Sequence, residues 1–253
     1  MIDEKEWIES LCEVKTILDR GSIKYWLDQG TLLGVVRDGK FISWDTDIDI
    51  GIFYSEARKI IKLVSKLEKK GFKVIIRDHY IHLYKNSVIL DLCFYRFKKN
   101  KAWILHRVVF IKGFFGKLLK HIYLKTDRLL YKNLYTEKDI STKFIFFITP
   151  SFALPAIRKF IFKILKLFRT KYYFFSFPGY YVKNFKKINF YNMNFNIPFY
   201  YEDYLELFYG KNWQIPDSRW GDGNITIGSS LRTKRKIDYN LSENYDRFGD
   251  SLI

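Results

Sequence analysis

The sequence predicts an α/β (α+β) fold in which helices flank a small mixed β-sheet. Two patterns in the first hundred residues support this prediction. Apolar residues recur at helical spacing over residues 3–20, and polar and apolar residues alternate with period two over residues 41–53. The composition agrees, because 48% hydrophobic and 19% aromatic residues in a chain of 253 supply a sizeable core and exclude wholesale disorder.

The expected elements of the first hundred residues follow one another in a simple order. An apolar stripe that begins at Trp7 predicts the first helix, and Gly21 ends it. Ser55 is placed to cap the start of a later helix, and Gly71 to cap its end. The full set is a helix over 3–20, a strand over 23–27, a turn and short helix over 30–37, a strand over 41–53, a helix over 55–70, and strands near 72–77, 80–85 and 87–95.

The positive charge of the chain is concentrated in its middle. The formal net charge is +17, yet residues 1–100 carry +3 and residues 201–253 carry −2. Residues 101–200 hold 19 Lys and Arg against three Asp and Glu, and no acidic residue lies between Ile140 and Tyr201. We therefore expect an α/β core over 1–100, a basic aromatic helical insertion over 101–190, and a C-terminal segment over 191–253 that packs back on the core.

Several classes of protein are excluded. Cys12 and Cys93 are too few for a disulfide framework, which indicates a reducing compartment, and no Cys and His residues have the spacing of a zinc site. The N-terminus is polar and acidic, so we expect no signal peptide. The longest uncharged apolar stretch, Phe144–Ile157, has 14 residues and contains two prolines, whereas a membrane span needs about 20 residues.

Most of the candidate catalytic and binding residues lie between residues 28 and 50. On the expected strand Asp45, Asp47 and Asp49 project from one face, and their repulsion is relieved by a cation or an opposing base. Hard divalent cations bind such carboxylates together with phosphate oxygens, so the pattern predicts a site for Mg²⁺ or Mn²⁺. Asp91, an acid inside an apolar strand, is a further candidate ligand.

The residues before the acids have the features of a phosphate-binding turn. Gly30 and Thr31 open a short helix, where glycine lets a phosphate approach the backbone and the helix N-terminus favours an anion. Arg37 is a candidate bidentate phosphate donor. The first alternative is an EF-hand calcium loop around the acids, which is disfavoured because Ile50 occupies the position where such a loop requires Gly. The others are a salt-bridged core acid at Asp91 and a surface ion pair at Arg37.

The motif Gly-Thr-Leu-Leu-Gly over residues 30–34, followed by an Arg, a Trp and an Asp-x-Asp pair, resembles the LicD family. This family includes bacterial phosphocholine transferases, fukutin and fukutin-related protein, and it belongs to the nucleotidyltransferase-like superfamily. A second, less specific match runs from Ile197 to Pro216, and Ser43 stands where the family usually has Pro. The resemblance implies a nucleotidyltransferase-like fold with catalytic, metal-binding Asp47, Asp49 and Asp91, a further metal ligand in Asp45, and substrate-binding Gly30, Thr31, Gly34, Arg37 and Trp44.

The resemblance also implies an activity. LicD-type proteins transfer a phosphorylated alcohol, such as phosphocholine or ribitol phosphate, from a CDP-activated donor to a hydroxyl of a sugar or lipid-linked cell-surface glycan, and release CMP. Mg²⁺ or Mn²⁺ held by the acids suits this chemistry. Two alternatives stay open. One is a nucleotidyltransferase that moves NMP from an NTP to a small acceptor, and the other is a non-enzymatic basic module that binds membranes or nucleic acid.

The basic middle contains a stretch typical of a membrane-surface helix over residues 156–169. A helix on a protein core has the same apolar face, but the lack of any acid on the polar face favours an anionic membrane, and the interleaved aliphatic residues fit lipid better than nucleic acid. We therefore expect a cytoplasmic protein bound peripherally to the inner face of the cell membrane. The residues predicted to face the membrane are Arg158, Lys159, Lys163, Lys166 and Arg169.

Overall fold

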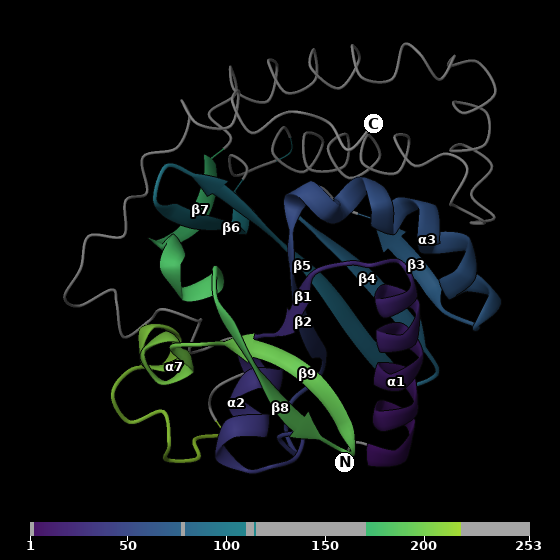
Figure 1. The fold of residues 1–253 in the computed structure, drawn as a ribbon, viewed down its shortest axis with the longest axis horizontal. Coiled ribbons are helices and arrows are strands. Elements are labelled where there is room, and N and C mark those ends of the chain that lie inside the picture. Colours follow the sequence, from purple (N-terminus) through teal and green to yellow (C-terminus); the bar gives the residue numbers. More distant parts are fainter. Residues whose placement is uncertain (1–2, 77–78, 110–113, 115–170, 219–253) are drawn as a thin grey trace. The chain divides into compact units, whose positions relative to one another are not determined.

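The computed structural model describes residues 3–76, 79–109, 114 and 171–218 (Figure 1). The described parts of residues 1–74, 79–104 and 176–237 form one compact unit, and those of residues 75–78 and 105–175 belong to a second. The elements in chain order are α1 (Glu4–Arg20), β1 (Tyr25–Leu27), α2 (Gln29–Arg37), β2 (Ile48–Phe53), η1 (Tyr54–Glu56), α3 (Ala57–Lys69), β3 (Lys73–Ile76), β4 (Tyr80–Lys85), β5 (Val88–Lys98), β6 (Lys101–Val109), β7 (Lys171–Pro178), η4 (Gly179–Val182), β8 (Phe185–Phe190), β9 (Met193–Pro198) and α7 (Tyr201–Tyr209).

A mixed sheet forms the centre of the fold. Its strands lie in the order β1-β2-β5-β4-β3, and β6 pairs with the C-terminal end of β5. The central strands β2 and β5 are parallel, whereas β1–β2, β4–β5 and β5–β6 are antiparallel. The prediction of an α/β fold with a small mixed sheet flanked by helices is therefore confirmed.

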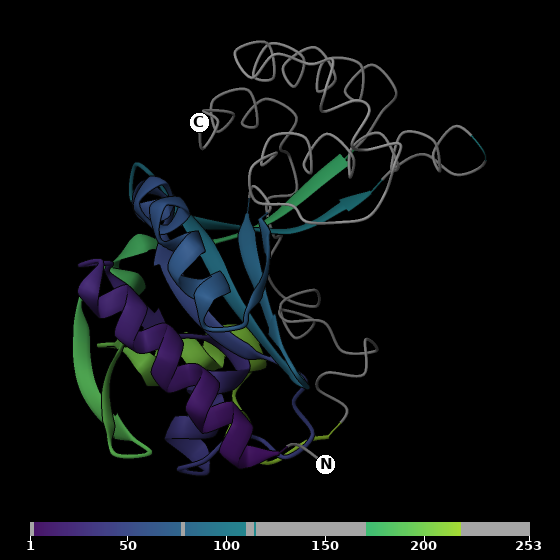
Figure 2. The ribbon, with the colours of Figure 1, turned by 90° about the vertical axis from the view of Figure 1, so that its right-hand side faces the viewer.

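Helices α1 and α3 lie side by side across one face of this sheet (Figures 1 and 2). The α1 helix begins where the Asp3 carboxylate accepts hydrogen bonds from the backbone N–H groups of Lys5 and Glu6, and Gly21 follows its last turn as predicted. Alternate residues of the central strands form a buried apolar face, which leaves the opposite face of the same strands for polar side chains. The fully buried residues of this apolar face are Ile48, Ile50 and Ile52 in β2, and Leu90 and Leu92 in β5.

The strand predicted over residues 41–53 begins only at Ile48. The backbone N–H of Asp45 donates to the carbonyl of Ile42, and this turn separates the preceding residues from the sheet. Asp45 and Asp47 therefore lie in the loop before β2. The prediction that they share a strand face with Asp49 is wrong.

The helix predicted from Ser55 begins at Ala57 instead. Ser55 lies inside the short 3₁₀ turn η1, and no side chain caps the start of α3, so the predicted cap is wrong. At the other end Gly71 follows the helix with a φ of 88°, a left-handed conformation that glycine adopts without strain. The predicted end of this helix is therefore confirmed.

The helical insertion predicted over residues 101–190 has strands at both of its described ends. Here β6, β7 and β8 are rich in aromatic and β-branched residues, which favour strands once a pairing partner is present. Strands β8 and β9 form a hairpin around Tyr191 and Asn192, which both have positive φ as a tight two-residue turn requires. Helical structure is therefore a wrong prediction at these ends, and residues 110–113 and 115–170 lie outside the described residues.

The short helix predicted near residues 201–209 is confirmed as α7. It precedes Gly210, whose φ of 89° ends the helix. Among the residues that the structure describes, no helix is both long and apolar enough to cross a membrane.

Candidate active site

Three polar side chains stand in a row across the centre of the sheet. Asp91 in β5 is the register partner of Asp49 in the parallel strand β2 and of His82 in the antiparallel strand β4. Register partners project from the same face of a sheet, so these three side chains are neighbours on the face opposite to the buried apolar one. Asp47 reaches the same place from the loop before β2.

The carboxylates of Asp47, Asp49 and Asp91 form a candidate metal centre. One oxygen atom from each lies within 4.8 Å of the others. All three residues are partly buried, so a cation held there would be only partly exposed to water. Oxygen donors in this number and spacing fit a hard divalent cation such as Mg²⁺ or Mn²⁺, with phosphate oxygens or water completing its coordination.

The acids around the start of β2 resist ionisation when no cation is present. Burial, and after it the neighbouring Asp47 carboxylate, raises the pKa of Asp45 to about 7. Burial and the charge of Asp91 raise the pKa of Asp47, and burial with the surrounding carboxylates raises the pKa of Asp49 well above its usual range. A divalent cation would offset this repulsion, which is the electrostatic condition of an ion-binding site.

These pKa shifts predict how the stability of the metal-free protein depends on pH. A raised folded-state pKa means that the folded protein binds more protons than the unfolded chain between about pH 4 and about pH 7. The free energy of unfolding should therefore fall as the pH rises through this window. Urea unfolding in EDTA at several pH values measures it, and Asp45→Asn should flatten the slope. A free energy of unfolding that stays constant or rises over this range would contradict the prediction.

The Gly30–Thr31 turn is held against the acidic loop. A Cβ on residue 30 would come within 2.2 Å of a carboxylate oxygen of Asp45, and glycine leaves room for that side chain. The buried Thr31 hydroxyl accepts a hydrogen bond of 2.8 Å from the backbone N–H of Asp49. Asp45 therefore lies beside the turn and does not belong to the cluster of three carboxylates. Thr31 positions the start of β2 through its hydrogen bond with Asp49.

Gly34, Arg37 and Trp44 lie further along α2 and the loop after it. A Cβ on Gly34 would be 2.6 Å from the carbonyl oxygen of Lys40, so glycine lets the helix approach the returning chain. The Arg37 guanidinium donates to both carboxylate oxygens of Asp38, at 2.8 and 2.6 Å, and lies 5.9 Å from the ring of the exposed Trp44. Arg37 thus forms an ion pair, as in the alternative to a phosphate contact, but its side chain is largely buried and not at the surface.

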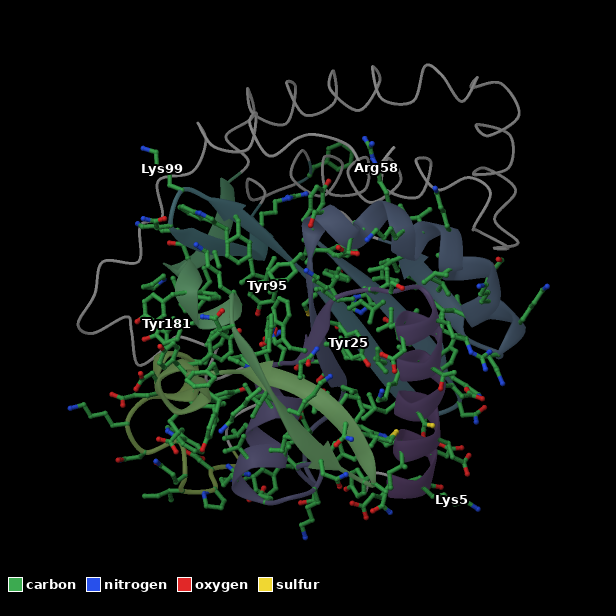
Figure 3. All side chains as sticks on the ribbon, viewed as in Figure 1. Lys5, Tyr25, Arg58, Tyr95, Lys99 and Tyr181 are labelled. Carbon is green, nitrogen blue, oxygen red and sulfur yellow. The ribbon has the colours of Figure 1, made fainter. Side chains whose placement is uncertain are left out.

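Sequence reasoning missed a buried network behind these acids. Asp28 is fully buried and accepts hydrogen bonds from the hydroxyls of Tyr95 (2.5 Å; labelled in Figure 3) and Tyr204 (2.8 Å). Its backbone N–H donates to the carbonyl of Asp49 at 3.2 Å, which joins the network to β2. Tyr204 belongs to α7 and lies 176 residues after Asp28, so no local pattern connects the two. The signal available in the sequence was the second, less specific match from Ile197 to Pro216, which contains Tyr204.

Further side chains adjoin Asp49. The Gln29 amide donates to an oxygen of Asp49 at 3.3 Å, and the Cys93 thiol lies 3.8 Å from the same oxygen. Burial, followed by the charges of Asp49 and Asp45, raises the pKa of Tyr209 well above its usual value, so this α7 residue lies close to the acids. The segment after β9 therefore approaches the site through α7.

The fold and the site have the features that the resemblance implies. A mixed sheet brings three carboxylates together next to a Gly-containing turn and a short helix, as expected for a nucleotidyltransferase-like domain. Residues 22–146 match the family model described as LicD/FKTN/FKRP, nucleotidyltransferase domain. The predicted resemblance is thereby confirmed for the part of the chain that the family model matches, which is just under half of it.

Curated relatives match a limited part of the chain. An uncharacterized protein of Rickettsia prowazekii is 34% identical over 85 residues, which are 34% of this chain and 31% of the relative. The human protein named ribitol 5-phosphate transferase FKRP is 29% identical over 105 residues, or 36% of this chain and 21% of the human protein. The chain thus spans less than a third of the length of these relatives.

One solved structure with some likeness is ANT(2")-Ia in complex with adenylyl-2"-tobramycin. It aligns with 65% of this chain and 97% of its own, at a TM-score of 0.32 and 15% sequence identity. The assignment of the fold rests on the sheet itself and on the family model.

Proposed function

We propose that this protein transfers a phosphorylated alcohol, such as phosphocholine or ribitol phosphate, from a CDP-activated donor to a hydroxyl of a cell-surface glycan. The observation that carries the proposal is the approach of the Asp47, Asp49 and Asp91 carboxylates to within 4.8 Å of one another. They lie in a domain that matches the LicD family model, and relatives in man and mouse bear the name of a ribitol 5-phosphate transferase. The donor, the acceptor and the whole activity are parts of the proposal.

The proposed reaction is a displacement at phosphorus. The acceptor hydroxyl oxygen forms a bond to the phosphorus that carries the alcohol, and the bond from that phosphorus to the bridging oxygen of CMP breaks. CMP departs with the bonding electron pair, and the hydroxyl proton passes to a carboxylate of the site. A hydroxyl is a poor nucleophile at neutral pH, so a carboxylate that accepts its proton lowers the barrier.

The three clustered carboxylates would hold Mg²⁺ or Mn²⁺ in this reaction. When bound, the ion neutralises the diphosphate and stabilises the departing CMP. The backbone of Gly30 and Thr31 opens α2 beside Asp45, where a helix N-terminus favours a phosphate group. Arg37 donates two of its five N–H groups to the Asp38 carboxylate, so a phosphate contact would use the others.

Product analysis tests the proposal. The purified protein is incubated with CDP-choline, CDP-ribitol and further CDP-alcohols in the presence of Mg²⁺ or Mn²⁺, with sugar acceptors, and parallel reactions contain NTPs. We expect CMP release from at least one CDP-alcohol, dependent on the metal and abolished by EDTA. Release of pyrophosphate from an NTP would instead identify a nucleotidyltransferase. If every donor is left intact with either metal, the proposed transfer is contradicted.

Peripheral binding to the inner, anionic face of the cell membrane is proposed from the sequence alone. The residues that would contact the membrane lie outside the described residues: Arg158, Lys159, Lys163, Lys166 and Arg169. With a lipid-linked acceptor, membrane binding would hold the enzyme next to its substrate.

A further inference from the structure

His82 lies at the candidate metal centre, although the sequence offers it no partner. It occupies β4 directly opposite Asp91 in the register of the β4–β5 pair, and its Nδ1 contacts the Oδ1 atom of that carboxylate. The side chains of both residues are largely shielded, with exposed fractions of 22% for His82 and 14% for Asp91. The contact is therefore formed inside the site and not at the open surface.

The chemistry of this contact assigns the proton. A carboxylate accepts hydrogen bonds and donates none, so Nδ1 of His82 carries a hydrogen and donates it to Asp91. One oxygen of Asp91 is thereby occupied, and the carboxylate group can no longer rotate freely about its χ2 angle. The other oxygen remains for a cation or for the proton of an acceptor hydroxyl.

Two neighbours hold the imidazole ring in this position. The ring centroids of Tyr80 and Tyr84, two residues before and after His82 on the same strand, lie 4.0 Å and 5.6 Å from the centroid of the imidazole. Side chains at i and i±2 share one face of a strand, so these aromatic rings flank the imidazole on both sides.

The geometry points to His82 as a positioning residue that orients the Asp91 carboxylate for the metal. This inference rests on the proposed function, because it takes the three carboxylates as the ligand set. Replacing a residue that hydrogen-bonds to a metal ligand in this way commonly weakens metal binding by about 10–100-fold. His82 would act through Asp91, without contacting the transferred group.

Binding of Mn²⁺ alone tests this role without any donor or turnover. Three variants are compared with the wild type by electron paramagnetic resonance of free Mn²⁺ and by calorimetry. His82→Asn keeps an N–H donor close to the position of Nδ1, whereas His82→Phe keeps a ring and removes the donor. His79→Phe is the matched control, because this nearby ring packs edge-on against Tyr80 with centroids 4.3 Å apart. Thermal unfolding in EDTA establishes that each variant is folded.

We expect His82→Phe to weaken Mn²⁺ binding by about 10–100-fold. His82→Asn should remain within a few-fold of the wild type, and His79→Phe should not change the affinity. Wild-type affinity in His82→Phe, or an equal loss in His82→Asn, would overturn the positioning role while leaving the proposed function intact. A wild-type protein that binds no Mn²⁺ would overturn the metal centre itself. Binding of Mn²⁺ without CMP release from any donor would contradict the proposed reaction alone.

Discussion

Replacing Asp49 by asparagine is expected to reduce metal-dependent CMP release by about a thousandfold or more. Asp49 is at the centre of the site: it is the register partner of Asp91, one of its oxygens accepts from Gln29, and its backbone N–H donates to Thr31. A lost ligand removes several kcal/mol of transition-state stabilisation, and about 4 kcal/mol corresponds to a thousandfold change in rate. Asp47→Asn and Asp91→Asn should have effects of the same size.

The fold should survive these substitutions. Asparagine keeps an oxygen that can accept from Gln29, and it replaces a carboxyl group whose ionisation is opposed by burial and by the neighbouring carboxylates. We therefore expect the metal-free Asp49→Asn protein to be at least as stable as the wild type in urea unfolding at neutral pH. Asp203→Asn, which changes an exposed acid in the first turn of α7, is the matched control for charge. Single-turnover release of CMP at wild-type rates in purified Asp49→Asn would remove this residue from the site.

Replacing Tyr204 by alanine is expected to lower the free energy of unfolding by about 3–5 kcal/mol. Its ring is fully buried between Phe177 and Phe208, with centroid distances of 5.5 and 4.7 Å, and its hydroxyl donates to Asp28 at 2.8 Å. Truncation leaves a cavity in an aromatic cluster and removes one of the two tyrosine donors from a buried carboxylate. Urea unfolding followed by circular dichroism measures the loss.

A second variant separates the hydroxyl from the ring. Tyr204→Phe keeps the packing and removes one donor to Asp28, while Tyr95 still donates at 2.5 Å, so a loss of about 1–2 kcal/mol is expected. Tyr200→Ala and Tyr200→Phe are the matched controls, because that tyrosine lies just before α7 and is 45% exposed. Equal unfolding free energies for the Tyr204 and Tyr200 variants would show that the buried network does not hold α7 in place.

Local patterns predicted the elements whose limits are set by local forces. The helix expected over 3–20 is α1, and the helix expected near 201–209 is α7, because apolar spacing and glycine at the end act within a few residues. Local patterns did not predict the residue at which β2 begins. It depends on the turn from Ile42 to Asp45 and on the hydrogen bond to the Thr31 hydroxyl, which comes from a different element.

The ends of the basic middle illustrate the same difference. Residues 101–109 and 171–178 have the apolar content of buried helices as well as of strands. A strand needs a partner, and the pairing of Trp103 with Arg96 across β5 and β6 is a contact of the fold and not of the local sequence. Periodicity alone therefore could not assign these segments.

The sequence by itself determined which residue types the site contains. The Asp-x-Asp pair at Asp47 and Asp49, the acid at Asp91 inside an apolar strand, and the Gly-containing turn were all visible in it. These residues carry the resemblance to the LicD family, because residue types and short spacings are properties of the chain itself, whatever its fold.

Only the tertiary structure decided how these residues meet. Register places Asp91 between Asp49 and His82, and α7 brings Tyr204 to Asp28 from 176 residues away. Register is a property of the whole paired sheet, because a slip of one residue would turn each of these side chains to the other face. The physical reason is that contacts between strands and helices depend on the packing of the entire core, which no single segment determines.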